Sequence, residues 1–342
     1  MSRTAGGVVK GRRIPRLMRS ALHRVTCLVA IGAAMLGVVA TATPVHAQTA
    51  PRRFTTTHVC TPAERAAGCL VVLGSGTPVP DPERQGAAYA VVVGDRTFLF
   101  DAGAGVMRRV AAAGLPIDGV TAAFLTHLHS DHTLGLPDLL LTTWVMGRRA
   151  PLVLVGPPGT RSMVDHLLAA WQEDIRVRTD GLERGQRDGH RAAVRESEGG
   201  VVYDSAGVRI TAVRVPHGEW KVAFAYVIRT PSRTLVLSGD TAPSDALAAA
   251  AAGADVLVHE TYPSVRLKPE NRPGGDEWPA YMHSVHTSDV EVGALAAKTG
   301  VKLLVLSHIV RMGGTDQELL AGVRQGGYRG PVRIAKDLDR YE

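Results

Sequence analysis

The densest group of chemically competent side chains in this 342-residue chain is the segment 126–132, Thr-His-Leu-His-Ser-Asp-His, which directly follows an apolar run. Because side chains alternate at the end of a strand, we expect His127 and His129 to point the same way, while Asp131 and His132 face a second position one turn later. Imidazole nitrogens and carboxylate oxygens suit a zinc-like divalent ion, whereas carboxylates alone would indicate magnesium or calcium. The segment therefore predicts a metal site. The competing interpretation is a chance cluster of exposed histidines.

Three later residues repeat the same context, a polar group at the end of an apolar run. They are His217, Asp240 and His308. Folds of the α/β class build their sites from residues that several strand ends deliver to one edge. Each residue alone is equally well read as a satisfied core or loop residue. With the first cluster they make seven ligands, enough for two metal ions that share Asp240.

Apolar runs separated by turn residues predict the elements that must position these ligands. The expected strands are 70–73, 89–93, 97–100, 120–125, 152–155, 208–215, 222–229, 234–237, 255–259, 302–307 and 331–334. The expected helices are 101–113, 160–173, 244–252, 289–299 and 316–324. We expect the charged, Gly-rich segment 174–200 and the Pro- and Gly-rich segment 262–285 to lack regular structure. Interleaved strands and helices without an internal repeat or linker predict an α/β sandwich in one domain, residues 48–342.

Residues 1–47 have the pattern of a secretory signal peptide: seven basic residues and no acidic one, then an apolar run and small residues near Ala47. The alternative, an uncleaved anchor, is disfavoured because the apolar run is shorter than the roughly 20 residues that span a bilayer. We therefore expect an exported protein, periplasmic or secreted, without a stable membrane anchor. The formal net charge of +7 belongs wholly to this segment. The remainder is close to neutral, which removes the charge argument for a polyanionic partner.

Two cysteines remain after the signal segment, Cys60 and Cys69, and they flank a short polar stretch. In an exported protein such a pair predicts a local disulfide, with two unpaired thiols as the alternative. Neither cysteine lies near the histidine motifs, so neither is expected to bind the metal.

The order and context of 127–132, His217, Asp240 and His308 resemble the metallo-β-lactamase superfamily of binuclear metal hydrolases. The resemblance covers roughly residues 68–340. Four further motifs are similar to its ribonuclease Z and arylsulfatase-like branch: Leu-Gly-Ser-Gly-Thr-Pro at 73–78, Asp-Ala-Gly at 101–103, Val-His-Glu at 258–260 and His-Thr-Ser at 286–288. The resemblance implies an αββα sandwich with its site along one edge.

Carried over to this sequence, the resemblance implies two metal sites. One is formed by His127, His129 and His217, the other by Asp131, His132 and His308, and Asp240 bridges both. Two divalent ions about 3.5–4 Å apart can share a water and lower its pKa, so that hydroxide attacks phosphorus, sulfur or carbonyl carbon. We expect zinc, with manganese or iron as alternatives, and we count Asp131 among the catalytic residues as well as the ligands.

The resemblance also implies that His286 and His259 form an outer polar pair that contacts the anionic group and assists the leaving oxygen. The alternative is that both are structural histidines. His283 competes with His286 for this role, but Thr287-Ser288 and a predicted helix follow His286 directly. We expect Glu260 to orient a neighbour and not to perform chemistry.

Departures from the family pattern narrow the predicted substrate. Ribonuclease Z carries a long arm for tRNA between the residues that correspond to His217 and Asp240, and only 23 positions separate them here. We therefore expect a small anionic substrate (a phosphodiester, aryl sulfate or related ester) and no tRNA or other nucleic acid as a partner. True β-lactamases of the superfamily typically lack a bridging aspartate at the position of Asp240, so lactam hydrolysis is not expected.

The alternative functions are a non-catalytic metal-binding protein, a thioesterase or an iron oxygenase on the same fold. A homodimer is a further possibility that the sequence leaves open.

Overall fold

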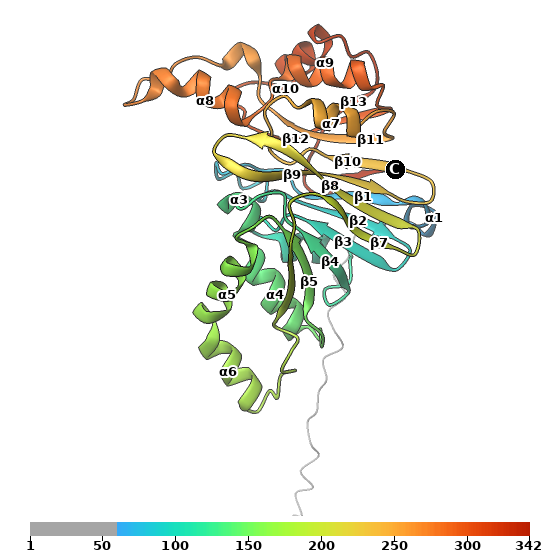
Figure 1. Ribbon diagram of the computed structural model, residues 1–342, viewed down its shortest axis with the longest axis vertical. Helices are drawn as coiled ribbons and strands as arrows, with labels where there is room; N and C mark the ends of the chain where they lie inside the picture. Colours follow the sequence, from blue (N-terminus) through green and yellow to red (C-terminus); the bar gives the residue numbers. More distant parts are fainter. Residues whose placement is uncertain (1–59) are drawn as a thin grey trace, which may run out of the picture. The chain divides into compact units, whose positions relative to one another are not determined.

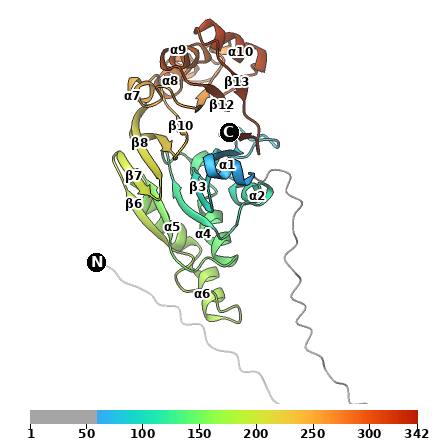
Figure 2. The ribbon, with the colours of Figure 1, turned by 90° about the vertical axis from the view of Figure 1, so that its right-hand side faces the viewer.

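The computed structural model describes residues 60–342, so the predicted signal segment 1–47 lies outside the described residues. Two seven-stranded sheets face each other, and helices cover their outer faces (Figures 1 and 2). Apolar residues fill both sides of the inner strands. In strand β1 (Cys69–Gly74), Leu70 and Val72 join the core between the sheets, while Val71 and Leu73 face the helices. This alternation follows from the two-residue period of a strand.

The strands of the first sheet, in spatial order, are β14 (Arg340–Tyr341), β1, β2 (Ala88–Val93), β3 (Arg96–Phe100), β4 (Val120–Phe124), β5 (Leu152–Gly156) and β6 (Ala192–Glu196). Those of the second are β13 (Val332–Ile334), β12 (Leu303–Ile309), β11 (Val256–Thr261), β10 (Thr234–Leu237), β9 (Trp220–Arg229), β8 (Val208–His217) and β7 (Gly200–Ser205).

The helices of the first half are α1 (Pro62–Ala67), α2 (Val106–Ala112), α3 (Ser130–Thr133), α4 (Leu136–Val145), α5 (Thr160–Ala170) and α6 (Gln172–Asp180). Those of the second half are α7 (Asp245–Ala250), α8 (Trp278–Val285), α9 (Asp289–Thr299) and α10 (Asp316–Gln325), with short 3-10 turns at Ser264–Arg266 and Gly275–Glu277. No helix among residues 60–342 is long and apolar enough to cross a membrane.

Three apolar clusters hold the four layers together. The first joins one sheet to α2, α4 and α5, the second lies between the sheets, and the third joins the other sheet to α7, α9 and α10. Phe100, Phe124 and Tyr226 pack their rings within 5.2 to 5.7 Å of one another in the middle cluster. The chain is therefore the predicted αββα sandwich.

Parallel pairing brings several strand ends to one edge. Strands β3 to β6 pair in parallel, and so do β10 to β13. Segment 126–132 follows β4, Asp240 follows β10, and His308 lies near the end of β12. The carboxyl ends of parallel strands are where open α/β sheets place their ligand sites.

Segments 174–200 and 262–285 are more regular than predicted, which corrects two expectations. Segment 174–200 contains most of α6 and all of β6. The apolar pattern misses them because α6 buries no residue and β6 buries only Val194. Segment 262–285 ends in α8, which has a proline in its first turn, a position that proline tolerates well.

The Cys60–Cys69 disulfide is present and both cysteines are buried, which confirms the predicted pairing. It joins the start of α1 to the start of β1.

Candidate metal centre

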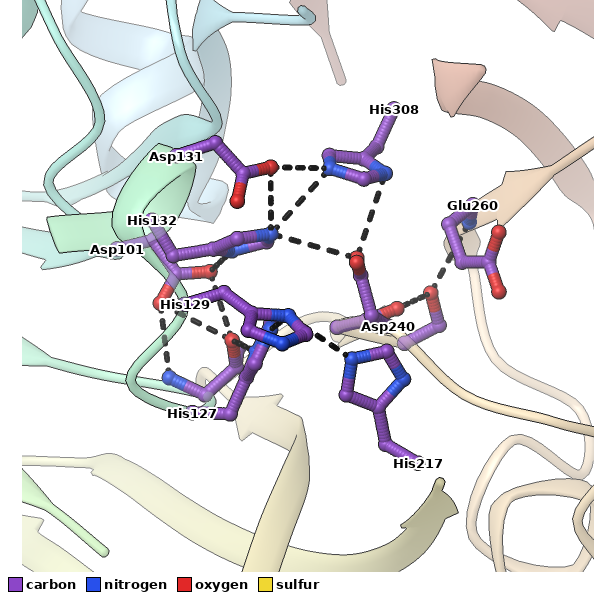
Figure 3. Close-up of polar contacts among 12 residues, drawn as sticks. Asp101, His127, His129, Asp131, His132, His217, Asp240, Glu260 and His308 are labelled. Atoms are coloured by element: carbon purple, nitrogen blue, oxygen red, sulfur yellow. Dashed lines mark hydrogen bonds and ion pairs between the residues drawn. The ribbon is translucent and has the colours of Figure 1, made fainter. Parts of the chain in front are cut away.

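The first ligand group comprises His127, His129, His217 and Asp240, whose ligand atoms all lie within 4.8 Å of one another. His129 Nδ1 is 2.9 Å from His127 Nε2 and 3.2 Å from His217 Nε2. His127, His217 and Asp240 are buried, and His129 is partly exposed. The structure thus converges three ring nitrogens and a carboxylate on one point (Figure 3).

The second group comprises Asp131, His132 and His308, again with ligand atoms within 4.8 Å of one another. His308 Nε2 lies 3.0 Å from Asp131 Oδ2 and 3.3 Å from His132 Nε2. The backbone of His308 has φ 45°, in the left-handed region, which is rare for a residue with a side chain. Strain of this kind is often held at functional sites.

Asp240 lies between the two groups. Its Oδ1 is 3.5 Å from His132 Nε2 and 3.4 Å from His308 Nδ1, although its ligand atom also clusters with the first group. The structure therefore brings together all seven predicted ligands and places Asp240 where it can reach both positions. Its role as a bridge stays a prediction.

The donor set fits two divalent cations. Asp240 Oδ1 and His308 Nδ1 are buried and have no hydrogen-bond partner. Buried polar atoms are normally satisfied, so such orphans call for a ligand. In addition, imidazole nitrogens face one another at 2.9 to 3.3 Å, where their lone pairs can converge on a cation. Nitrogen and oxygen donors of this kind suit zinc and its neighbours.

The electrostatics favour the metal-binding protonation states of His127, His217 and Asp240, whereas His132 tends to hold a proton that a metal ion would replace. Burial lowers the pKa of His127 well below its usual value and that of His217 to about 4, which keeps both rings neutral. Burial opposes ionisation of Asp240, but His308 and His132 outweigh it and lower the pKa of this carboxyl well below its usual range. At His132, burial is outweighed by Asp240 and Asp101, which raise the pKa. The centre therefore attracts positive charge, which a metal ion supplies.

Two residues that support the ligands were not assigned a role from the sequence. Asp101 Oδ2 lies 2.8 Å from His132 Nδ1, and its Oδ1 accepts a hydrogen bond from the backbone N–H of Thr126. This contact fixes the ring of His132 with Nε2 toward the centre. The indole of Trp220 donates from Nε1 to His129 Nε2 at 2.8 Å. The sequence signal for Asp101 was the Asp-Ala-Gly motif at 101–103.

The two predicted outer histidines differ in their placement. His286 is 9% exposed, and its ring centre lies 5.7 Å from that of His217. Burial lowers its pKa, but Glu260, with Oε2 3.3 Å from His286 Nδ1, outweighs burial and raises the pKa to about 9. Glu260 Oε1 accepts from the backbone N–H of Thr287, so Glu260 holds His286 in place, as expected of an orienting residue.

His259 is fully buried and bonds through Nδ1 to the carbonyl of Glu260. Within residues 60–342, no hydrogen bond, ion pair or ring contact joins it to the seven ligands. Its role toward substrate stays a prediction. His283, the competitor of His286, is exposed and contacts the hydroxyl of Tyr262 at 3.1 Å.

Comparison with known proteins agrees with this geometry. The model of the β-lactamase superfamily domain matches residues 96–309, which is more than half of the chain. The chain belongs to this superfamily. It is 35% identical over 287 residues to ribonuclease Z of Mycobacterium bovis (strain BCG / Pasteur 1173P2), covering 80% of this chain and 97% of that protein. It is also 35% identical over 296 residues to ribonuclease Z of Mycobacterium marinum, covering 80% and 98%.

Solved structures show the same fold. The metallo-β-lactamase fold protein YhfI from Bacillus subtilis superposes with a TM-score of 0.61 at 19% identity, over 80% of this chain and 98% of its own. The short form of human tRNase Z superposes with a TM-score of 0.58 at 20% identity, over 80% and 98%. The chain is accordingly a metallo-β-lactamase superfamily hydrolase of ester bonds, with a site for two metal ions.

The expectation of no nucleic-acid partner is wrong. It relied on the short connection from His217 to Asp240, which in the structure consists of β9, β10 and tight turns. The ribonuclease Z relatives nevertheless align over nearly their whole length with this chain. The shortness of one connection therefore does not separate this superfamily member from ribonucleases.

Proposed function

We propose that the chain is a metal-dependent phosphodiesterase that hydrolyses RNA, tRNA included. The observation that carries this proposal is 35% identity with ribonuclease Z across 97% of that protein, in a chain that keeps a full set of seven ligands. We further propose zinc as the resident metal. A non-catalytic metal-binding protein would need neither the partly exposed ligand His129 nor the histidine His286 that Glu260 holds beside the centre.

The residues divide the work as follows. His127, His129, His217 and Asp240 would hold one ion, and Asp131, His132 and His308 the other, with Asp240 shared. Two such ions supply Lewis acidity and an activated water for attack on phosphorus. Asp101 and Trp220 hold His132 and His129 in their orientations.

His286 acts on the substrate in this proposal. Glu260 keeps the ring of His286 cationic near neutral pH, because it raises the pKa to about 9. A cationic imidazole beside the centre binds a phosphate oxygen and can donate a proton to the leaving oxygen. A positioned acid of this kind contributes about 10²–10⁴-fold to the rate.

Turnover tests the proposal directly. The purified, metal-quantified protein is incubated with a tRNA transcript, an unstructured RNA, aryl phosphodiesters, phosphomonoesters, aryl sulfates, thioesters and lactams. We expect cleavage of RNA and aryl phosphodiesters that is lost in Asp240→Ala. Turnover of thioesters or lactams alone, or no RNA cleavage by fully loaded protein, would refute it.

A second candidate is an exported hydrolase of a small phosphodiester or aryl sulfate. The Cys60–Cys69 disulfide favours it, because disulfides persist in oxidising compartments outside the cytosol. Fractionation of cells that express the full chain tests export: this candidate requires the protein outside the cytosol, shortened by the signal segment. A full-length cytosolic protein that cleaves RNA would leave only the first proposal.

A further inference from the structure

A pocket of about 460 Å³ contains none of the metal ligands, but parts of its lining are joined along the chain to residues of the site. Four parts of the chain form it: the loop that follows β1, the segment at Glu270, the start of α8, and the end of β12 with the loop after it. Two of them lead directly to site residues. Ile309 in the pocket wall follows the ligand His308, and α8 begins at Trp278 in the wall and ends next to His286. The volume lies in the range of small-ligand sites.

The wall is apolar and its charges balance. Val79, Trp278, Ile309 and Met312 supply apolar surface, whereas the charged residues are two arginines and two carboxylates, Arg84, Arg311, Asp81 and Glu270. Arg84 lies 3.8 Å from Asp81, and Arg311 pairs at 2.7 Å with Asp316 outside the pocket. A pocket with these charges does not select an anion. It suits an uncharged group that belongs to the same molecule as a phosphate at the metal centre.

The walls are held in place before any ligand arrives. Asp337 accepts hydrogen bonds from the backbone N–H groups of Ser75 and Gln85, which fixes the loop after β1. In the α8 part of the wall, the ring of Trp278 stacks on that of Tyr281 at 5.5 Å, and the guanidinium of Arg272 lies 5.5 Å from the centre of the indole ring. A wall that is ordered in advance lowers the entropy lost on binding.

We infer that this pocket binds the planar aromatic group attached to the scissile phosphodiester, with Trp278 as its aromatic contact. The inference rests on the proposed function, since it assumes that a phosphate ester occupies the metal centre. This planar aromatic group can be either a nucleobase of RNA or the aryl group of a small ester. Contact between a base and an aromatic side chain typically strengthens binding by about ten-fold or more.

Calorimetric binding to the metal-loaded protein tests the inference without requiring turnover. The probes are adenosine monophosphate, phenyl phosphate and ribose 5-phosphate, which share the phosphate and differ in the aromatic group. We expect at least one aromatic probe to bind about ten-fold more tightly than ribose 5-phosphate. Preference for adenosine monophosphate identifies a nucleobase as the occupant, and preference for phenyl phosphate identifies an aryl ester.

Variants then assign the preference to the pocket. Trp278→Ala should remove it while leaving the affinity for ribose 5-phosphate unchanged, and Trp278→Phe should retain most of it. Trp171→Ala is the matched control, because Trp171 is 47% exposed at the end of α5 and does not line the pocket. Equal affinity for all three probes, or a preference that survives Trp278→Ala, would overturn the inference.

Kinetic measurements distinguish a failure of the pocket inference from a failure of the proposed function. If the protein cleaves RNA, Trp278→Ala should raise KM for a base-bearing substrate and not for one with an abasic nucleotide at the scissile bond, at similar kcat. Failure of the proposed function shows as no hydrolysis by wild-type protein. Failure of the pocket inference shows as hydrolysis with no dependence on the base.

Discussion

At the scale of single residues, Asp240 lies between the two ligand groups. Its Oδ1 is within 3.5 Å of nitrogens from His132 and His308, and its ligand atom also clusters with the first group. Removing the carboxylate leaves buried imidazoles that face one another without a shared anion. If Asp240 bridges as predicted, the binding of both ions depends on this one side chain.

We predict that Asp240→Ala loses metal and activity together, with metal content falling from two ions per chain to one or none. Elemental analysis after gel filtration measures the content, and turnover of an aryl phosphodiester measures the activity. Asp165→Ala, which changes an exposed aspartate on α5, is the control and should retain both. An Asp240→Ala protein that keeps two ions would exclude a shared ligand.

His286 should behave differently, because it touches the ligands only at ring-to-ring distance and none of its nitrogens belongs to either ligand group. We predict that His286→Ala keeps its metal and loses about 10²–10⁴-fold in kcat. His283→Ala is the control: it removes an exposed histidine of α8 and should change neither metal content nor kcat. If His286→Ala loses metal instead, the residue is a ligand.

The sequence predicts well which seven residues gather at the centre and predicts poorly which residues support them, for one physical reason. Each ligand follows or ends an apolar strand, which is a local pattern. The contacts of Asp101 with His132 and of Trp220 with His129 join positions 31 and 91 residues apart, so no local pattern announces them. The motif around His259 was recognised from the sequence and the side chain is fully buried, so its role toward substrate stays a prediction.

At the scale of elements, the Cys60–Cys69 disulfide closes a loop with a sequence separation of 9 around α1. Closing a loop of this length restricts the unfolded chain, which stabilises the folded state by about 2–3 kcal/mol. We predict a loss of that size in the free energy of unfolding for the double variant Cys60→Ser/Cys69→Ser, measured by denaturant titration. Metal content should not change. Equal stability of the variant and the oxidised protein would contradict the prediction.

The predicted strands coincide with buried apolar runs, whereas β6 and α6, which bury almost nothing, were missed, and so was α4 although it buries four large apolar side chains. Strands β4 and β5 lie where the sequence has apolar runs, because nearly all of their residues are buried and must therefore be apolar. Strand β6 buries one residue and is held by backbone pairing with β5, which leaves no trace in side-chain type. Helix α6 buries none, and ion pairs such as Arg178 with Asp174 line its surface.

At the scale of the whole molecule, the metal centre joins the two sheets. Asp131 and the first three histidines follow β4 in the first sheet, whereas His217, Asp240 and His308 come from β8, β10 and β12 in the second. Two polar contacts already cross between the sheets near this edge: the Tyr226 hydroxyl donates to the Leu125 carbonyl, and Tyr89 and Ser307 join their hydroxyls at 2.8 Å. Metal ions held by ligands from both sheets would link the two sheets much more strongly.

Metal binding should therefore stabilise the folded chain as a whole. A ligand that binds only the folded state adds about 3–4 kcal/mol when its free concentration is 100 to 1,000 times its Kd. For a chain of this size that corresponds to a rise in Tm on the order of 10 °C. We predict that chelation lowers the Tm by this amount, that added zinc restores it, and that Asp240→Ala shows little response. Scanning calorimetry with and without chelator measures the shift. If elemental analysis shows that the metal is gone and the Tm has not moved, the ions do not join the two sheets.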